Sequence, residues 1–239
     1  RARITLNYQL IGRSDEQIQE QYAADPKVLS LEEILYSSIL TDDVNEKKEI
    51  FNTAIKLHPA DYRAYNNLGV LAYNEGDYAT AASYFEKALG ANASAPEVQL
   101  NLGYLELLQG NVSDAESLMA LGNEAKAGAE ALGNLYIAQG EYGRAAALLE
   151  DKATNSAALA QLLNKDYSTV RETLDKIENP DATTYYIKAL LGARTSNIAF
   201  VYDGLKQAIK LDPSMAKKAA GDLEFTKYLQ DATFKSIIK

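Results

Sequence analysis

The sequence contains no cysteine and no tryptophan, and it has only one histidine among its 239 residues. A chain without cysteine forms no disulfide and has neither a thiolate nucleophile nor a cysteine-based metal site. One histidine cannot form a His–His metal pair, and this one, His58, immediately precedes Pro59. Because the residue before a proline is displaced from the helical region, we expect His58 to be an ordinary turn residue. We therefore expect a protein that is not an enzyme and that binds no metal and no cofactor.

Basic residues are also in short supply. The chain has 24 Lys and Arg against 33 Asp and Glu, a formal net charge of −9. Because phosphate neutralisation requires a basic face, we expect no nucleic acid partner. Long apolar runs are missing too: none approaches the roughly 20 residues of a membrane span, so we expect no direct membrane span. With 47% hydrophobic residues, the chain has enough apolar surface for a packed core.

Residues 4–10 alternate apolar and polar side chains, which is the two-residue period of a β-strand. A lone strand leaves its backbone groups unpaired. We therefore expect residues 1–12 to be an extended segment, the end of an upstream domain. The partner strand would lie before Arg1, in another copy, or outside this chain altogether.

From residue 13 onward the sequence has the start and stop signals of short helices. Three Ser-x-x-Gln/Glu sequences have the spacing of a capping box, at Ser14–Gln17, Ser30–Glu33 and Ser113–Glu116. Glycine followed by a polar residue marks tight turns at Gly76, Gly110 and Gly140. Helices of about 10 to 15 residues joined by tight turns form antiparallel hairpins.

These hairpins repeat. Gly69, Gly103 and Gly133 each follow a leucine, at spacings of 34 and 30 residues. Each is followed at constant intervals by a turn glycine, an alanine and a large apolar residue. The last two are Ala81 and Phe85, then Ala115 and Met119, then Ala145 and Leu149. The small residues allow two helices to cross closely, and the large residue fills the space beside them at interior density. Because one hairpin cannot bury its outer face alone, the hairpins must stack.

This pattern resembles the tetratricopeptide repeat, a 34-residue helix pair. Residues 62–95 match it best, through Tyr65, Leu68, Gly69, Ala81, Phe85 and Ala88. The resemblance implies an all-α fold, a right-handed α-solenoid of stacked antiparallel helix pairs over residues 13–239. We expect repeats at about 28–61, 62–95, 96–125, 126–153, 154–181 and 182–215, followed by a helical cap at 216–239. Because the fourth and fifth repeats are shortened, we expect short helices near 155–164 and 167–178.

The resemblance also implies a concave groove, lined by the first helix of each pair, that holds a peptide of a partner protein. The corresponding positions here are Arg63, Asn66, Asn67, Val70, Tyr73, Asn74, Asn101, Tyr104, Glu130 and Asn134. Asn67 and Asn101 lie 34 residues apart and share a register. An asparagine side chain can both donate to and accept from one peptide unit. The alternative is that both are ordinary exposed residues. Arg63 has no basic counterpart in the next two repeats, so we expect no carboxylate clamp.

Two functions stay open on this basis. The first is a non-catalytic scaffold for protein–protein interaction, which binds a peptide segment of an unknown partner in the groove. The second is a structural spacer or assembly module beside an envelope-anchoring domain, without a groove ligand. The closing sequence, residues 222–235, resembles that of some bacterial cell-envelope repeat proteins. That resemblance favours the bacterial envelope or periplasm and leaves the cytoplasm open.

Overall fold

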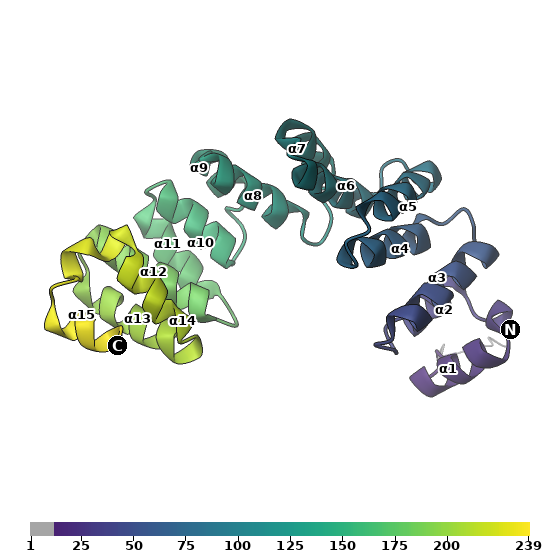
Figure 1. Cartoon of the computed structure of the whole chain (residues 1–239), viewed down its shortest axis with the longest axis horizontal. Coiled ribbons are helices and arrows are strands. Elements are labelled where there is room, and N and C mark those ends of the chain that lie inside the picture. Colours follow the sequence, from purple (N-terminus) through teal and green to yellow (C-terminus); the bar gives the residue numbers. More distant parts are fainter. Residues whose placement is uncertain (1–11) are drawn as a thin grey trace, which may run out of the picture. The chain divides into compact units, whose positions relative to one another are not determined.

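The computed structural model describes residues 12–239, and these residues form helices joined by turns (Figure 1). No strand occurs in this part of the chain. The strand expected within residues 1–12 falls on residues outside it, apart from Gly12. The chain divides into two compact units, the first ending at Gly122 and the second beginning at Asn123. Each unit is described by itself.

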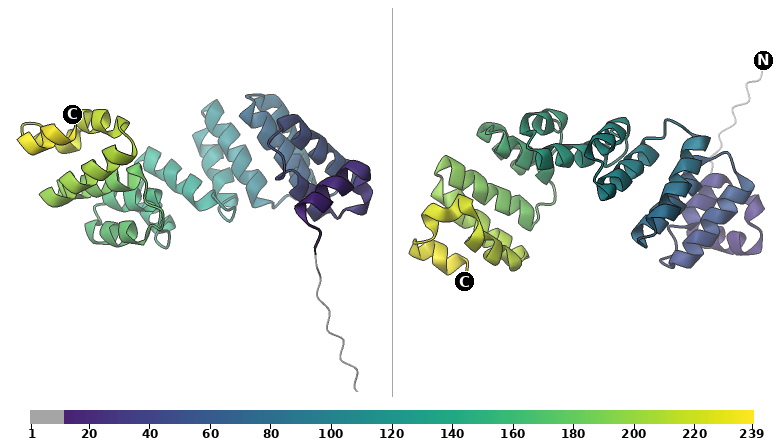
Figure 2. Two further views of the ribbon diagram at one scale, coloured as in Figure 1. Left: turned by 90° about the horizontal axis from the view of Figure 1, so that it is seen from below. Right: turned by 45° about the horizontal axis from the view of Figure 1, so that its top comes forward.

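Unit 1 consists of helices that pack in sequential pairs: α2 on α3, α4 on α5 and α6 on α7 (Figure 2). The helix α1 and the short 3-10 helix η1 precede the first pair. The bounds are α1 (Asp15–Ala24), η1 (Pro26–Val28), α2 (Leu31–Ser37), α3 (Val44–Leu57), α4 (Tyr62–Asn74), α5 (Tyr78–Ala91), α6 (Pro96–Gln109) and α7 (Val112–Leu121).

Unit 2 continues the same arrangement, with α8 on α9, α10 on α11 and α12 on α13. The terminal elements α14, η2 and α15 pack on the last pair and bury Phe225 and Phe234 completely. The bounds are α8 (Gly128–Gln139), α9 (Tyr142–Leu148), α10 (Asn155–Leu163), α11 (Tyr167–Lys176), α12 (Ala182–Thr195), α13 (Ile198–Leu211), α14 (Ser214–Gly221), η2 (Leu223–Tyr228) and α15 (Ala232–Ile237). The predicted all-α fold of helix pairs is confirmed, as are the short helices α10 and α11.

The capping predictions have a mixed outcome. At α1, the Gln17 amide donates to the Ser14 hydroxyl at 3.3 Å and the Ser14 amide donates to the Gln17 side chain at 2.9 Å. Ser30 and Glu33 form the same reciprocal box at α2. The third prediction is wrong: α7 begins at Val112, so Ser113 lies inside the helix and Asn111 is its N-cap. His58 ends α3 in a turn, as expected.

The predicted close approach of paired helices is confirmed at three glycines. A Cβ atom on Gly69 would lie 2.5 Å from the Phe85 ring. The same atom on Gly103 would lie 2.7 Å from Met119, and on Gly133 it would lie 2.6 Å from Leu149. Each large side chain therefore occupies the space that a side chain on the opposite helix would need.

The turns inside five helix pairs share one backbone conformation. Each contains a residue with positive φ: Gly76 at 80°, Gly110 at 83°, Gly140 at 79°, Lys165 at 67° and Ser196 at 57°. The amide of the next residue donates to a carbonyl five residues earlier, as from Asp166 to Gln161 at 2.9 Å. The turns at Lys165 and Ser196 escaped the sequence pattern because neither residue is a glycine.

Lys165→Gly should raise the free energy of unfolding by about 0.5–1 kcal/mol, because glycine adopts the left-handed conformation without the energy that it costs an L-residue. The higher conformational entropy of glycine in the unfolded chain offsets part of this gain. Urea unfolding followed by circular dichroism measures the difference. Lys165→Ala is the matched control: it removes the same side chain but keeps an L-residue at φ 67°. An equal gain in both variants would show that the lysine side chain, and not the backbone, is the cause.

Candidate functional site

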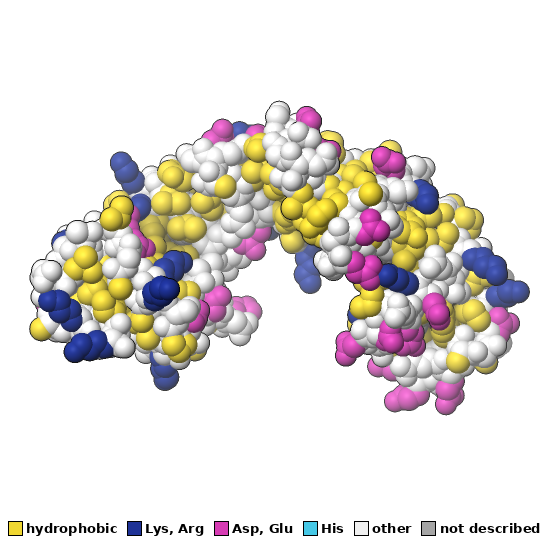
Figure 3. All heavy atoms as spheres, in the orientation of Figure 1, with side chains coloured by type: hydrophobic (Ala, Val, Ile, Leu, Met, Phe, Trp, Pro, Cys, Tyr) yellow, Lys and Arg dark blue, Asp and Glu magenta, His cyan; other side chains and the backbone are white. Residues whose placement is uncertain are grey.

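A hollow of about 190 Å³ lies in unit 1 where helices α4, α5 and α6 meet. Its lining comprises Val70, Tyr73, Asn74, Phe85, Asn101 and Tyr104. Five of these six are predicted groove residues on first helices; the sixth, Phe85, comes from the second helix α5. Hydrophobic side chains gather over this part of unit 1 in the space-filling view (Figure 3).

The hollow has an apolar interior and polar groups at its edge. Phe85 is only 1% exposed and is the most buried residue of the lining, whereas Asn74 and Tyr104 are exposed. The Tyr73 ring packs edge-on against Tyr78, with centroids 5.4 Å apart. Tyr104 is 36% exposed, and the partial burial of its phenol raises the pKa of that group. Apolar walls with a few hydrogen-bonding groups are typical of binding sites for an apolar group attached to a polar chain.

The asparagines of the two repeats are linked to each other. The Asn101 side-chain amide donates to Asn66 Oδ1 at 2.9 Å, and Asn66 is only 8% exposed. Asn66 therefore joins α4 to α6 and is not presented to a ligand. The Asn101 carbonyl oxygen remains available as an acceptor. Asn67, which is half-buried, forms no side-chain hydrogen bond with any residue between 12 and 239.

Arg63 is also engaged within the chain. Its guanidinium donates to Glu32 on α2 at 2.8 Å and to Asp61 at 3.0 Å. Hydrogen bonds from Arg63 lower the pKa of both carboxyl groups, and the pKa of Arg63 is raised in return. This network ties one helix pair to the next. The cation is therefore already neutralised by neighbours in its own unit.

The last two predicted groove residues belong to unit 2. Asn134 is exposed on α8. Glu130 is half-buried and lines a polar hollow of about 560 Å³ together with Asn155 and Lys176, among others. Neither residue lines the hollow of unit 1. Five of the predicted groove residues thus line the hollow of unit 1, and Glu130 lines a hollow of unit 2. The other four, Arg63, Asn66, Asn67 and Asn134, line neither hollow.

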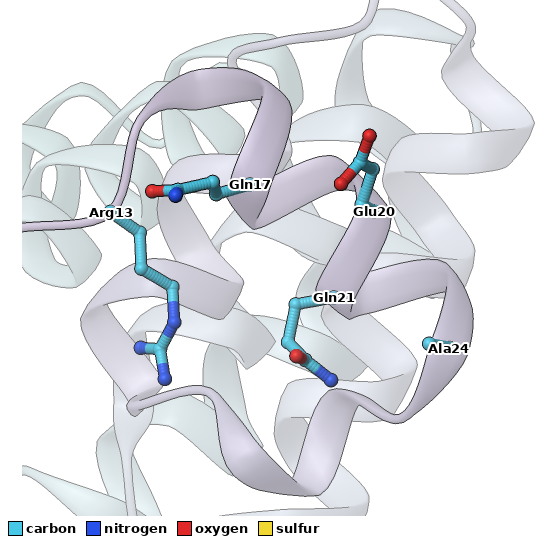
Figure 4. Close-up of a pocket in the computed structure, with 5 residues that line it drawn as sticks. All are labelled: Arg13, Gln17, Glu20, Gln21 and Ala24. Atoms are coloured by element: carbon cyan, nitrogen blue, oxygen red, sulfur yellow. The ribbon is translucent and has the colours of Figure 1, made fainter.

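Another hollow, of about 410 Å³, lies against α1 (Figure 4). All of its lining residues come from one short stretch of chain, namely Arg13, Gln17, Glu20, Gln21 and Ala24. Arg13 is paired with Glu33 at 2.6 Å, and Gln17 serves the α1 capping box. This hollow is the outer face of a single helix whose polar groups largely serve local structure, so it is a weaker candidate.

Residues 12–239 contain no group of His, Asp and Glu side chains that could hold a metal ion. Within the same range, the helices are too short or too polar for any of them to span a bilayer.

Comparison with known proteins identifies the repeat. Tetratricopeptide repeat family models match residues 48–96 and 71–130, and a further one matches residues 129–160. No curated protein matches the chain by sequence. The helix pairs, the close approach at Gly69, Gly103 and Gly133, and these matches all describe the same repeat.

Three solved structures have a similar fold. PilF of Pseudomonas aeruginosa is 15% identical, with a TM-score of 0.60 over 83% of this chain and 96% of that chain. PilW, a type IV pilus biogenesis factor, is 14% identical, with a TM-score of 0.59 over 83% of this chain and 98% of that chain. A tetratricopeptide repeat protein from Parabacteroides merdae is 13% identical, with a TM-score of 0.53 over 94% of this chain and 91% of that chain. At these identities the likeness concerns the fold alone. The chain is a tetratricopeptide repeat protein.

Proposed function

We propose that this protein is a non-catalytic scaffold that binds a peptide segment of a partner protein at the unit 1 hollow. Tetratricopeptide repeats generally mediate protein–protein interactions. The observation that carries the proposal is the hollow itself: an apolar interior edged by amide and phenol groups, on the first helices of two neighbouring repeats. A preformed site of this kind binds without the cost of ordering the receptor.

The lining indicates the chemistry of the segment. No charged side chain lines the hollow, so a large apolar side chain would enter it. The backbone beside that side chain could donate to the Asn101 carbonyl oxygen. Asn67 does not line the hollow, but it lies about one helical turn before Val70 on α4, so its side-chain amide could pair with the same peptide. Residues 12–122 carry 18 acidic and 7 basic side chains. Because such an excess attracts cations over distance, we propose a segment that is basic around its apolar anchor.

Selection of peptides from a random phage-displayed library on the immobilised protein tests this proposal. We expect enriched sequences with basic residues around a large apolar residue. Val70→Asp places a charge in the hollow and should weaken their binding by at least tenfold, as measured by fluorescence anisotropy. Val112→Asp is the matched control, because Val112 is exposed on α7 and does not line the hollow. Equal affinities of the two variants would contradict the proposal.

The asparagines give a second prediction. Asn67→Ala should weaken peptide binding without changing stability, because its side chain has no partner within the described residues. Asn101→Ala should weaken binding and also lower the free energy of unfolding by about 1–3 kcal/mol, because it leaves the buried Asn66 oxygen without a donor. Anisotropy and urea unfolding measure the two effects separately. A loss of stability in Asn67→Ala equal to that in Asn101→Ala would count against this division of roles.

The alternative function is a structural spacer or assembly module beside an envelope-anchoring domain. It requires no ligand in the hollow. If the protein is such a spacer, the same selection should enrich no sequence. Any peptides that are enriched should bind Val70→Asp as tightly as they bind the unchanged protein.

A further inference from the structure

A second hollow, of about 110 Å³, lies in unit 2 between helices α11, α12 and α13. Its lining comprises Arg171, Leu174 and Asp175 from α11, Lys188 and Leu191 from α12, and Phe200 from α13. None of these residues belongs to the predicted groove. The site is therefore independent of the peptide site proposed for unit 1.

Two cations converge on one aromatic ring in this hollow. Lys188 Nζ lies 5.1 Å from the centroid of the Phe200 ring, and the guanidinium carbon of Arg171 lies 5.6 Å from the same centroid. The negative face of an aromatic ring attracts cations. The ring thus brings two positive charges from different helices to one small space, where they repel each other unless an anion joins them.

The anion that the chain itself supplies is poorly placed. Arg171 Nε lies 3.9 Å from Asp175 Oδ2, and the two side chains are 68% and 76% exposed. An exposed pair at that distance contributes little. Lys188 forms no ion pair with any residue in the described part of the chain. Both cations therefore retain most of their capacity to bind an external anion.

We propose that this hollow binds a carboxylate carried on a short apolar group. The carboxylate would lie between Arg171 and Lys188, and the apolar group would contact Leu174 and Leu191. A hollow of about 110 Å³ suits the carboxylate end of a short apolar chain. Both a free short-chain acid and an acidic side chain of a bound peptide have this chemistry. The ligand would replace Asp175 as the partner of Arg171.

Titration of the full ¹⁵N-labelled chain with sodium hexanoate tests the site. We expect saturable shifts of amide resonances in α11, α12 and α13, and no such shifts with hexanol or hexylammonium. Lys188→Gln should weaken binding by about tenfold or more, the loss of a charge-assisted hydrogen bond. Asp175→Asn should strengthen binding by about twofold to fivefold, because it removes the competing carboxylate.

Lys206→Gln is the matched control, since Lys206 is exposed on α13 and does not line the hollow. It should bind hexanoate as the unchanged protein does, and Val70→Asp in unit 1 should do so too. Circular dichroism of each variant checks the fold. Equal affinities of Lys188→Gln and Lys206→Gln, or shifts that rise without saturation, would overturn the proposal.

A second titration distinguishes the source of the carboxylate. The blocked peptide acetyl-Leu-Glu-Leu-amide is compared with its Gln analogue. Binding of the Glu peptide alone, weakened by Lys188→Gln, assigns the site to an acidic side chain of a partner. Binding of hexanoate without either peptide assigns it to a free acid. Absence of binding by both hexanoate and the Glu peptide would refute the site.

Discussion

Phe85→Ala should lower the free energy of unfolding by about 3–5 kcal/mol, the largest effect expected for any single substitution considered for this chain. Phe85 is 1% exposed and fills the space left by Gly69 on the opposite helix. The substitution loses the favourable free energy of burying the phenyl ring, and it leaves a cavity between α4 and α5. The cavity would also extend the hollow that Phe85 lines, so this substitution should impair peptide binding as well.

Urea unfolding measures the loss, and amide hydrogen exchange locates it. Exchange should accelerate first in α4 and α5, because stability in stacked repeats comes from each unit and its nearest neighbours. Tyr78→Ala is the control: this aromatic residue begins the same helix but is 46% exposed. If Tyr78→Ala cost as much as Phe85→Ala, the central role of Phe85 in the core would be refuted.

Gly69→Ala should cost about 1–3 kcal/mol, since it overpacks the same contact from the other side. The added Cβ would lie 2.5 Å from the Phe85 ring, and that ring is 1% exposed, so moving it would disturb the surrounding core. Gly90→Ala is the matched control. Gly90 lies in α5 with no atom within 4 Å of the added Cβ, so this substitution should be neutral or stabilise by up to about 1 kcal/mol.

The double variant Gly69→Ala with Phe85→Leu should be more stable than the sum of the two single effects implies, by about 0.5–3 kcal/mol. Two other repeats already contain this combination. Ala189 and Leu205 occupy the corresponding positions in one buried cluster, and Ala158 and Leu174 occupy them in another. Urea unfolding of the four proteins completes the cycle. Strict additivity would show that Gly69 and Phe85 are not coupled.

The turns show where sequence reasoning reached its limit. The three glycine turns were found because glycine readily adopts positive φ. The turns at Lys165 and Ser196 have the same conformation without that residue, so only the backbone showed them. In the last helix pair glycines allow a close approach on both helices: a Cβ on Gly192 in α12 would lie 2.6 Å from the Val201 amide nitrogen, and one on Gly204 in α13 would lie 2.8 Å from the Ala189 amide nitrogen. Neither glycine stands at the repeat position of Gly69, which Ala189 occupies here, so the repeat spacing did not predict them.

The candidate site also has features that the sequence predicted and features that only the structure showed. The resemblance to the tetratricopeptide repeat implied a groove with Val70, Tyr73, Asn74, Asn101 and Tyr104 in its lining, and all five line the hollow. The resemblance could not show that the side chains of Arg63 and Asn66 are already hydrogen-bonded, because their partners Glu32 and Asn101 come from neighbouring helix pairs. Phe85 was predicted as a core residue, and it is one, but it also lines the hollow.

Residue spacing was sufficient to establish the helix pairs, their turns at glycine and the faces they bury, because these depend on interactions between residues close together along the chain. Stacking settled which polar side chains stay available to a ligand and which are already paired. It also brought Arg171 and Lys188 to the ring of Phe200. Such contacts join residues from different helices, and their geometry depends on how the helices pack and not on any local pattern.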